Sequence, residues 1–108
     1  MLLSLALRWG QDAGLSVAAA LSRVTSEPVR LLGDSIGALS SSAGRIVEGG
    51  VADLCLFDAD EQWSVRPGTL ISQGQHTPFG FDSTGMALPG RVRMTLVAGG
   101  VAYDARPR

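Results

Sequence analysis

The spacing of apolar residues changes near residue 44, and this change limits the chain to a mixed α+β fold. Before that point apolar side chains recur every three or four positions, which is the period of an amphipathic helix. After it the period shortens to two, which is the period of a strand. The length of 108 residues is that of one domain. We therefore predict an α+β fold, with short helices followed by a small, mostly antiparallel β-sheet or sandwich.

The same pattern divides the chain into three segments. Residues 1–33 are predicted to be helical, and residues 34–44 to be a linker rich in serine and glycine. Residues 45–108 are predicted to form a small β domain. The three segments together are expected to make one compact unit.

Three helices are expected in the first segment. Gly10 and Gly14 are expected to mark the end of the first, with Gln11 and Asp12 in the turn between them. Ser16 is the expected N-cap of the second helix, and Ser26 that of the third. Gly33 is the expected end of the third helix. The first helix is apolar almost all round, so it needs more packing partners than two short neighbours offer. Its predicted apolar face consists of Leu2, Leu3, Leu5, Ala6 and Trp9.

The β domain is expected to begin with a strand in residues 51–57. An acidic turn at 58–61 ends it, and a short strand follows at 62–65. Residues 79–90 are interpreted as a loop. The clearest strand then starts at Arg91. Its predicted faces are Val92, Met94, Leu96 and Ala98 on one side, and Arg91, Arg93, Thr95 and Val97 on the other. A hairpin turn is predicted at Gly99-Gly100.

Few side chains are suited to catalysis or metal binding. The chain has one histidine and one cysteine, whereas a zinc or iron site needs three or four ligands. Cys55 lies in an apolar run and is interpreted as a buried small hydrophobic residue. Asp58, Asp60 and Glu61 are interpreted as a solvated turn, and Asp53 falls on the opposite strand face from Asp58. We therefore predict no catalytic, cofactor-binding or metal-binding residue in this chain.

The single histidine lies in the loop "QHTPFGF". Proline restricts the preceding threonine to extended conformations, and the phenylalanines provide apolar anchors. The simpler interpretation is a loop held by aromatic packing. The alternative is a loop that contacts a ligand or a neighbouring domain. The candidate interface residues are His76, Thr77, Pro78 and Phe79.

Charge and hydropathy exclude two classes of partner. The formal net charge is -1 and no basic block is present, so nucleic-acid binding is not expected. No apolar stretch reaches the length of a membrane span. The apolar start lacks the basic region of a signal peptide. We expect a cytoplasmic protein.

Two glycine-containing motifs resemble the C-terminal end of a dihydroorotase, a family of the metal-dependent amidohydrolase superfamily. The first, G-x-[IL]-x-x-G-x-x-A-D-L, is also typical of hydantoinases and allantoinases, whereas the second, T-P-F followed by G-x-V-x-x-T-x-x-x-G, is more specific. The first is carried by Gly44, Ile46, Gly49, Ala52, Asp53 and Leu54. The second is carried by Thr77-Pro78-Phe79, Gly90, Val92, Thr95 and Gly99.

This resemblance implies a function for the longer parent protein. Dihydroorotases hydrolyse dihydroorotate reversibly to N-carbamoyl-aspartate in pyrimidine biosynthesis, with zinc held on a (β/α)8 barrel. Their metal ligands include an H-x-H pair, further histidines, an aspartate and often a carboxylated lysine. None of these motifs is present here, so we expect this chain to follow the barrel and to be inactive alone, with no cofactor of its own.

The resemblance also leaves alternatives open. One is a non-catalytic interaction module, such as a structural partner of aspartate transcarbamoylase. Another is the tail of a hydantoinase- or allantoinase-type hydrolase. Without a barrel, the apolar face of the first helix is expected to be exposed. That helix is then expected to mediate self-association, or to bind the missing barrel or a partner chain.

Overall fold

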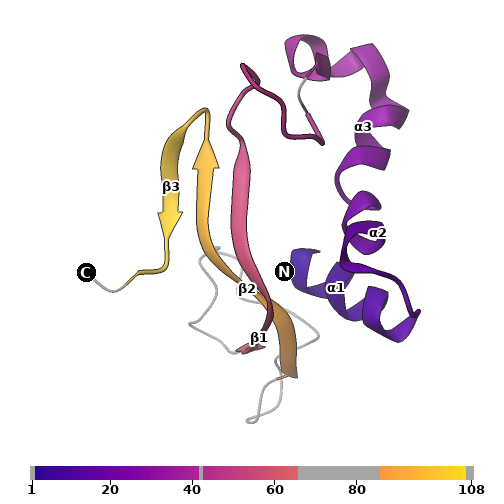
Figure 1. Ribbon diagram of the computed structural model, residues 1–108, viewed down its shortest axis with the longest axis vertical. Helices are drawn as coiled ribbons and strands as arrows, with labels where there is room; N and C mark the ends of the chain where they lie inside the picture. The colour runs from indigo at the N-terminus through magenta and orange to yellow at the C-terminus, as the bar shows by residue number, and fades with distance from the viewer. Residues whose placement is uncertain (1, 42, 66–85, 107–108) are drawn as a thin grey trace.

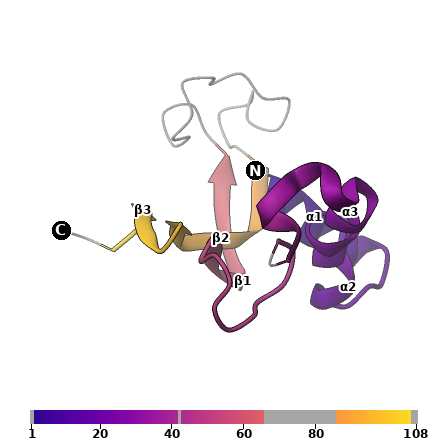
Figure 2. The ribbon, with the colours of Figure 1, turned by 90° about the horizontal axis from the view of Figure 1, so that it is seen from above.

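The computed structural model describes residues 2–41, 43–65 and 86–106, and these form an α+β structure (Figure 1). Three strands make one antiparallel sheet in the order β1-β2-β3, and the helices lie together on one side of it in both views (Figures 1 and 2). The predicted α+β class is therefore confirmed. The elements are α1 (Leu2–Asp12), α2 (Val17–Ser22), α3 (Ser26–Leu32), the 3-10 helix η1 (Gly33–Ser41), β1 (Leu54–Val65), β2 (Met86–Val97) and β3 (Gly100–Asp104).

Helix α1 buries one residue of its predicted apolar face, Ala6, and leaves others of that face exposed. Leu2 is 65% exposed and Trp9 is 49% exposed, although both belong to the predicted apolar face. The predicted exposure of the apolar face is therefore confirmed at Leu2 and Trp9. Because α1 is apolar almost all round, its sequence does not show which face of the helix is buried. The buried residues of α1 are Ser4, Ala6, Leu7 and Gly10.

Gly10 lies inside α1 and does not end it, which corrects that part of the predicted stop, whereas Gly14 lies just beyond the end of the helix with a φ of 73°. The helix continues to Asp12, and a Cβ at position 10 would lie only 2.6 Å from the Cβ of Ala20. A glycine here lets α1 and α2 pack in close contact, which outweighs its low intrinsic helix propensity. Ala20 is correspondingly buried, at 1% exposure.

The helix ends follow the predicted capping residues in part. The Ser16 hydroxyl accepts a hydrogen bond from the Ala19 amide at 3.1 Å, so the predicted N-cap of α2 is confirmed. The N-cap of α3 is Thr25, one residue before the predicted Ser26. The Thr25 hydroxyl does not cap the helix, because it donates instead to the Leu21 carbonyl at 2.7 Å.

Gly33 is the C-cap of α3, as predicted, with a φ of 55°. The chain then enters η1 and not an open loop, although the composition of residues 34–44 indicated a linker. Gly37 interrupts η1 with a φ of 64°, so the 3-10 segment is kinked there. The predicted division into three segments stays a prediction.

Strand β1 is continuous, which corrects the predicted acidic turn between two short strands. β1 pairs with β2 from Leu54 to Val65, and the register shifts between Asp58 and Gln62. The Asp58 carboxylate accepts hydrogen bonds from the amides of Asp60 and Glu61, at 3.0 and 3.2 Å. The acidic residues therefore form a bulge, which absorbs extra residues without ending the strand.

Strand β2 begins at Met86, so the predicted loop at 79–90 is wrong for its last five residues. Leu88 is fully buried, and Pro89 is among the most buried side chains. Proline is tolerated in a strand where the ladder is irregular, and Pro89 pairs with Gln62 directly beside the β1 bulge. The Pro-Gly pair signalled a turn, but tertiary burial overrides that signal.

The predicted alternation of β2 is confirmed in part further along: Ala98 lies in the turn after the strand, and Thr95, predicted to lie on the outer face, is half-buried. Val92, Met94 and Leu96 are half-buried, and Arg91, Arg93 and Val97 are exposed. The following turn is Ala98-Gly99, one residue before the predicted Gly99-Gly100, because Val97 pairs with Gly100. Both turn residues have positive φ, 49° and 81°, as a two-residue hairpin turn of type I′ requires.

A buried hydroxyl joins α1 to the sheet. Ser4 is 3% exposed, accepts a hydrogen bond from the Trp63 indole at 2.9 Å, and donates one to the Gly90 carbonyl at 3.2 Å. Leu7 packs on the same glycine, where an added Cβ would lie 2.5 Å from Leu7 Cδ1. The core of the described residues therefore lies where α1 meets the C-terminal end of β1 and the N-terminal end of β2.

We predict that Gly90→Ala destabilises the fold more than Gly49→Ala. Both glycines have positive φ, 89° and 77°, but only the Gly90 site lacks space for a Cβ. The strained backbone costs about 1–2 kcal/mol at either position, and the clash with Leu7 adds about 1–3 kcal/mol at Gly90 alone. Urea unfolding followed by tryptophan fluorescence measures both. Equal losses would show that Leu7 does not pack on Gly90 as described.

Candidate functional site

The predicted interface loop, His76, Thr77, Pro78 and Phe79, lies outside the described residues. Its role as an interface stays a prediction. The candidate site is therefore assembled from the acidic bulge, the cysteine, the hollow beside α3 and the motif residues around the hairpin.

Two carboxylates of the acidic bulge, those of Asp58 and Glu61, form structural contacts. Asp58 accepts the two backbone amides that shape the bulge. Glu61 forms an ion pair with Arg91 at 3.3 Å and a second with Arg93 on the neighbouring strand. Glu61 is half-buried between the two arginines, so the prediction of a solvated turn is wrong for this residue.

The donor groups in the described part of the chain do not fit a zinc site. No group of three or more His, Cys, Asp or Glu residues that could hold a metal ion occurs among the described residues. Asp53 lies apart from the acidic bulge, at the hairpin. The chemistry of the donors thus gives no support to metal binding by these residues.

Cys55 is exposed, so the prediction of a buried small hydrophobic residue is wrong. It lies on β1 opposite Thr95, away from the end of the sheet where α1 packs. The side chains around it still cover part of the thiol, and this burial raises the pKa of Cys55 above its ordinary value. A thiol with a raised pKa is protonated at neutral pH and therefore a weak nucleophile.

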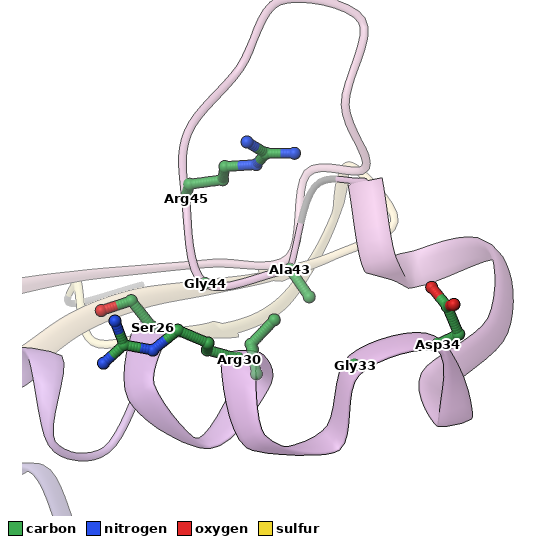
Figure 3. Close-up of a pocket in the computed structure, with 8 residues that line it drawn as sticks. Ser26, Arg30, Gly33, Asp34, Ala43, Gly44 and Arg45 are labelled. Atoms are coloured by element: carbon green, nitrogen blue, oxygen red, sulfur yellow. The ribbon is translucent and has the colours of Figure 1, made fainter.

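An open hollow of about 390 Å³ lies between α3 and the segment after η1 (Figure 3). Arg30, which lines the hollow, forms an ion pair with Glu27 at 3.7 Å. Asp34, which is negatively charged, also lines the hollow. Since charges of both signs border it, the hollow selects neither anions nor cations. Its lining residues are Ser26, Val29, Arg30, Gly33, Asp34, Ala43, Gly44 and Arg45.

Gly44 occupies a position where only glycine fits. Its φ is 74°, and a Cβ there would lie 3.0 Å from Ser26 Cα and 3.1 Å from a Val29 methyl. The chain after η1 therefore passes directly over α3. Gly49 has a φ of 77° and open space around it, so its conformation alone favours glycine.

Asp53 holds the hairpin turn in place. Its carboxylate accepts a hydrogen bond from the Ala98 amide at 2.7 Å, and the Ala52 carbonyl accepts one from the Gly99 amide at 3.0 Å. Ala98 has a positive φ, which is costly for a residue with a side chain. The two hydrogen bonds from residues 52–53 stabilise that conformation.

The amino-acid sequence of the chain is similar to sequences of dihydroorotases and dihydroorotase-like proteins. No protein-family model matches the chain, and no solved structure matches it significantly. A dihydroorotase-like protein of Pseudomonas putida is 39% identical over 95% of this chain, and one of Pseudomonas aeruginosa is 37% identical over 96%. A dihydroorotase of Anaplasma phagocytophilum is 32% identical over 96%. The chain is a dihydroorotase-like segment.

The matched region covers 21–22% of these relatives, so the chain spans about a fifth of their length. The resemblance predicted from the motifs is confirmed. Among the described helices, none has both the length and the apolar character needed to cross a membrane.

Three of the motif residues that the structure describes, Gly44, Asp53 and Gly90, shape the backbone or let elements pack closely. Gly90 admits α1 to the sheet, Gly44 lies against α3, and Asp53 supports the hairpin. Sequence reasoning missed Ser4 and Trp63, which join the helix to the sheet. A serine within a leucine-rich helix carries no sign that its hydroxyl is buried between two partners.

We expect Asp53→Ala to lower the free energy of unfolding by about 1 kcal/mol, because the Ala98 amide loses its acceptor. Asp53→Asn keeps a side-chain oxygen and should recover most of that loss. Asp12→Ala, which removes an exposed partner of Arg8, should cost less than about 0.5 kcal/mol. Urea unfolding and hydrogen exchange of the Ala98 amide are the measurements. Unchanged exchange in Asp53→Ala would contradict the described turn.

Proposed function

We propose that this chain is the C-terminal portion of a dihydroorotase-like cyclic amide hydrolase and supplies scaffold, with the reacting groups elsewhere in the longer protein. The observation that supports this proposal is the sequence match to proteins named dihydroorotase or dihydroorotase-like. The match covers 95–96% of this chain and about a fifth of the length of each relative. The relatives' names favour dihydroorotate over the substrates of hydantoinases or allantoinases. The parent reaction would be the reversible conversion of dihydroorotate to N-carbamoyl-aspartate.

The side-chain inventory supports a scaffold role. Opening a cyclic amide requires an activated water, which a metal such as zinc supplies in this superfamily. The whole sequence has one histidine and one cysteine, and its basic residues are all arginine. It therefore contains neither an H-x-H pair nor a lysine that can be carboxylated.

The contacts of the described residues support the same conclusion. Most of their polar side-chain contacts fix the backbone or join elements: Ser4 joins α1 to the sheet, Asp53 holds a turn, and Asp58 shapes a bulge. Glu61 is neutralised by two arginines. These groups are committed to holding the structure, which leaves them poorly placed to move protons in a reaction.

The direct experiment is a dihydroorotate hydrolysis assay on the purified chain with added zinc. We expect no turnover above the background rate and no stoichiometric zinc binding. His76→Ala is the matched control, because it removes the single imidazole; contaminating activity would be the same in both proteins. Stoichiometric zinc binding with turnover that His76→Ala abolishes would contradict the proposal.

A non-catalytic interaction module is the second candidate, with aspartate transcarbamoylase as the proposed partner. The observation that favours it is that the two Pseudomonas relatives, at 39% and 37% identity, are named dihydroorotase-like. The exposed Trp9 and Leu2 on α1 offer an apolar contact surface.

For this candidate we expect co-elution of the chain with the aspartate transcarbamoylase of its own organism on size exclusion, and loss of co-elution for Trp9→Glu. Gln11→Glu, at an exposed position on α1, adds the same single negative charge and is the control for charge alone. A run without the transcarbamoylase tests self-association through the same helix. Separate elution of the chain and the transcarbamoylase at all concentrations would contradict the proposed interaction.

A further inference from the structure

The helices hold one another through a continuous series of contacts. Ala20 of α2 is buried in close contact with α1. Arg23, which follows α2, forms an ion pair with Glu27 of α3 at 3.4 Å. Beyond η1, Gly44 lies directly against α3, and Arg45 lines the hollow beside that helix. The described residues up to Arg45 are here named the helical part.

The sheet holds its own first residues in the same way. The Ala52 carbonyl accepts a hydrogen bond from the Gly99 amide, and the Asp53 carboxylate accepts one from the Ala98 amide. Strand β1 begins at the next residue and pairs with β2 along its length. The described residues from Ala52 onward are here named the sheet part, because the hairpin fixes its beginning.

Residues 46–51 connect the two parts and have exposed apolar side chains. Ile46 is 86% exposed and Val47 is 41% exposed, so neither side chain is packed on the helices or on the sheet. The Gly50 amide donates to the Val47 carbonyl at 3.1 Å, which is a hydrogen bond within the segment itself. At Gly49 an added Cβ would meet no atom within 4 Å. The backbone can therefore rotate at Gly49 and Gly50 without loss of packing.

A second connection between the two parts lies at the other end of the sheet. There the Ser4 hydroxyl bonds with the Trp63 indole and the Gly90 carbonyl, and Leu7 packs on Gly90. These four residues are here named the α1 latch. Within the described part of the chain, the largest helix–sheet contact is that between α1 and β2. Figure 1 shows the segment after η1 reaching β1 at one end of the sheet and α1 lying beside the other end.

We propose that the helical part swings away from the sheet as one body, with Gly49-Gly50 as the hinge and the α1 latch as the contact that separates. Opening breaks the contacts of Ser4 and Leu7 and keeps the hydrogen bonds within each part. It therefore requires less free energy than unfolding the whole chain. A hinge needs only a few loop residues that absorb the change in φ and ψ. This motion belongs to the chain itself and does not rest on the proposed function.

The hinge explains the spacing of the first motif, G-x-[IL]-x-x-G-x-x-A-D-L. Its first glycine, Gly44, lies against α3 and so belongs to the helical part. Its alanine and aspartate, Ala52-Asp53, accept the hairpin amides and so belong to the sheet part. Its second glycine, Gly49, lies between these two fixed points with open space around it. The motif thus contains two attachment points with a pivot between them.

Hydrogen exchange of the Trp63 indole proton measures the opening. This proton donates to the Ser4 hydroxyl inside the α1 latch, so it exchanges when the latch separates. Indole protons are resolved from backbone amides by NMR, and Trp9→Phe identifies the Trp63 resonance. We expect the protection factor of the indole proton to be roughly tenfold lower than those of the backbone amides of α1 and of the β1–β2 ladder.

A matched pair of glycine variants tests the hinge. Gly49 and Gly37 both have positive φ, 77° and 64°, and both have open space around them, but Gly37 lies in η1 within the helical part. Alanine strains the closed state at either position, and only at position 49 does the swing relieve that strain. We expect Gly49→Ala to speed exchange of the Trp63 indole proton about tenfold, and Gly37→Ala to leave it nearly unchanged. Gly49→Asn should give a smaller increase, since asparagine tolerates positive φ better than alanine does.

Three outcomes would overturn the proposal. An indole proton as protected as the backbone amides would show that the latch separates only when the whole chain unfolds. Equal acceleration by Gly49→Ala and Gly37→Ala, or none by Gly49→Ala and Gly49→Asn, would show that residue 49 is not the hinge. Acceleration of the α1 and β1–β2 amides together with the indole proton would show that Gly49→Ala destabilises the whole fold and does not favour a swing of one part.

Discussion

The position of α1 depends on the hydroxyl of Ser4. A hydroxyl buried without partners costs several kcal/mol, but this one accepts from the Trp63 indole and donates to the Gly90 carbonyl. Since Gly90 has no side chain, Leu7 fits against the same strand position. These contacts draw together residues 4, 63 and 90 and place the core at one end of the sheet. The opposite end has to be stabilised by other means.

Hydrogen bonds to the backbone stabilise that opposite end. Asp53 and the Ala52 carbonyl accept the amides of the hairpin turn, and Ala98 keeps a left-handed conformation as a result. Between the two ends, the Asp58 bulge adjusts the register of β1 against β2. The sheet thus has one end packed on a helix and one end fixed by polar contacts, with an apolar face exposed there.

This arrangement gives a physical meaning to the dihydroorotase-like motifs. Gly44, Gly49, Gly90 and Gly99 all have positive φ, and two of them also lack space for a side chain. Asp53 acts as a hydrogen-bond acceptor for the Ala98 amide of the hairpin turn. The described motif residues therefore act through backbone conformation and close packing.

The sequence by itself determined the α+β class, the N-cap at Ser16, the stop at Gly33 and the alternation of β2, because each depends on neighbours within a few residues. The tertiary structure alone decided which side of α1 is buried, since nearly every side is apolar and only contact with β2 selects one. It also decided that the acidic stretch is a bulge and that β2 begins before Pro89. Local signals for turns were present at both places, and strand pairing between residues far apart in the chain outweighed them.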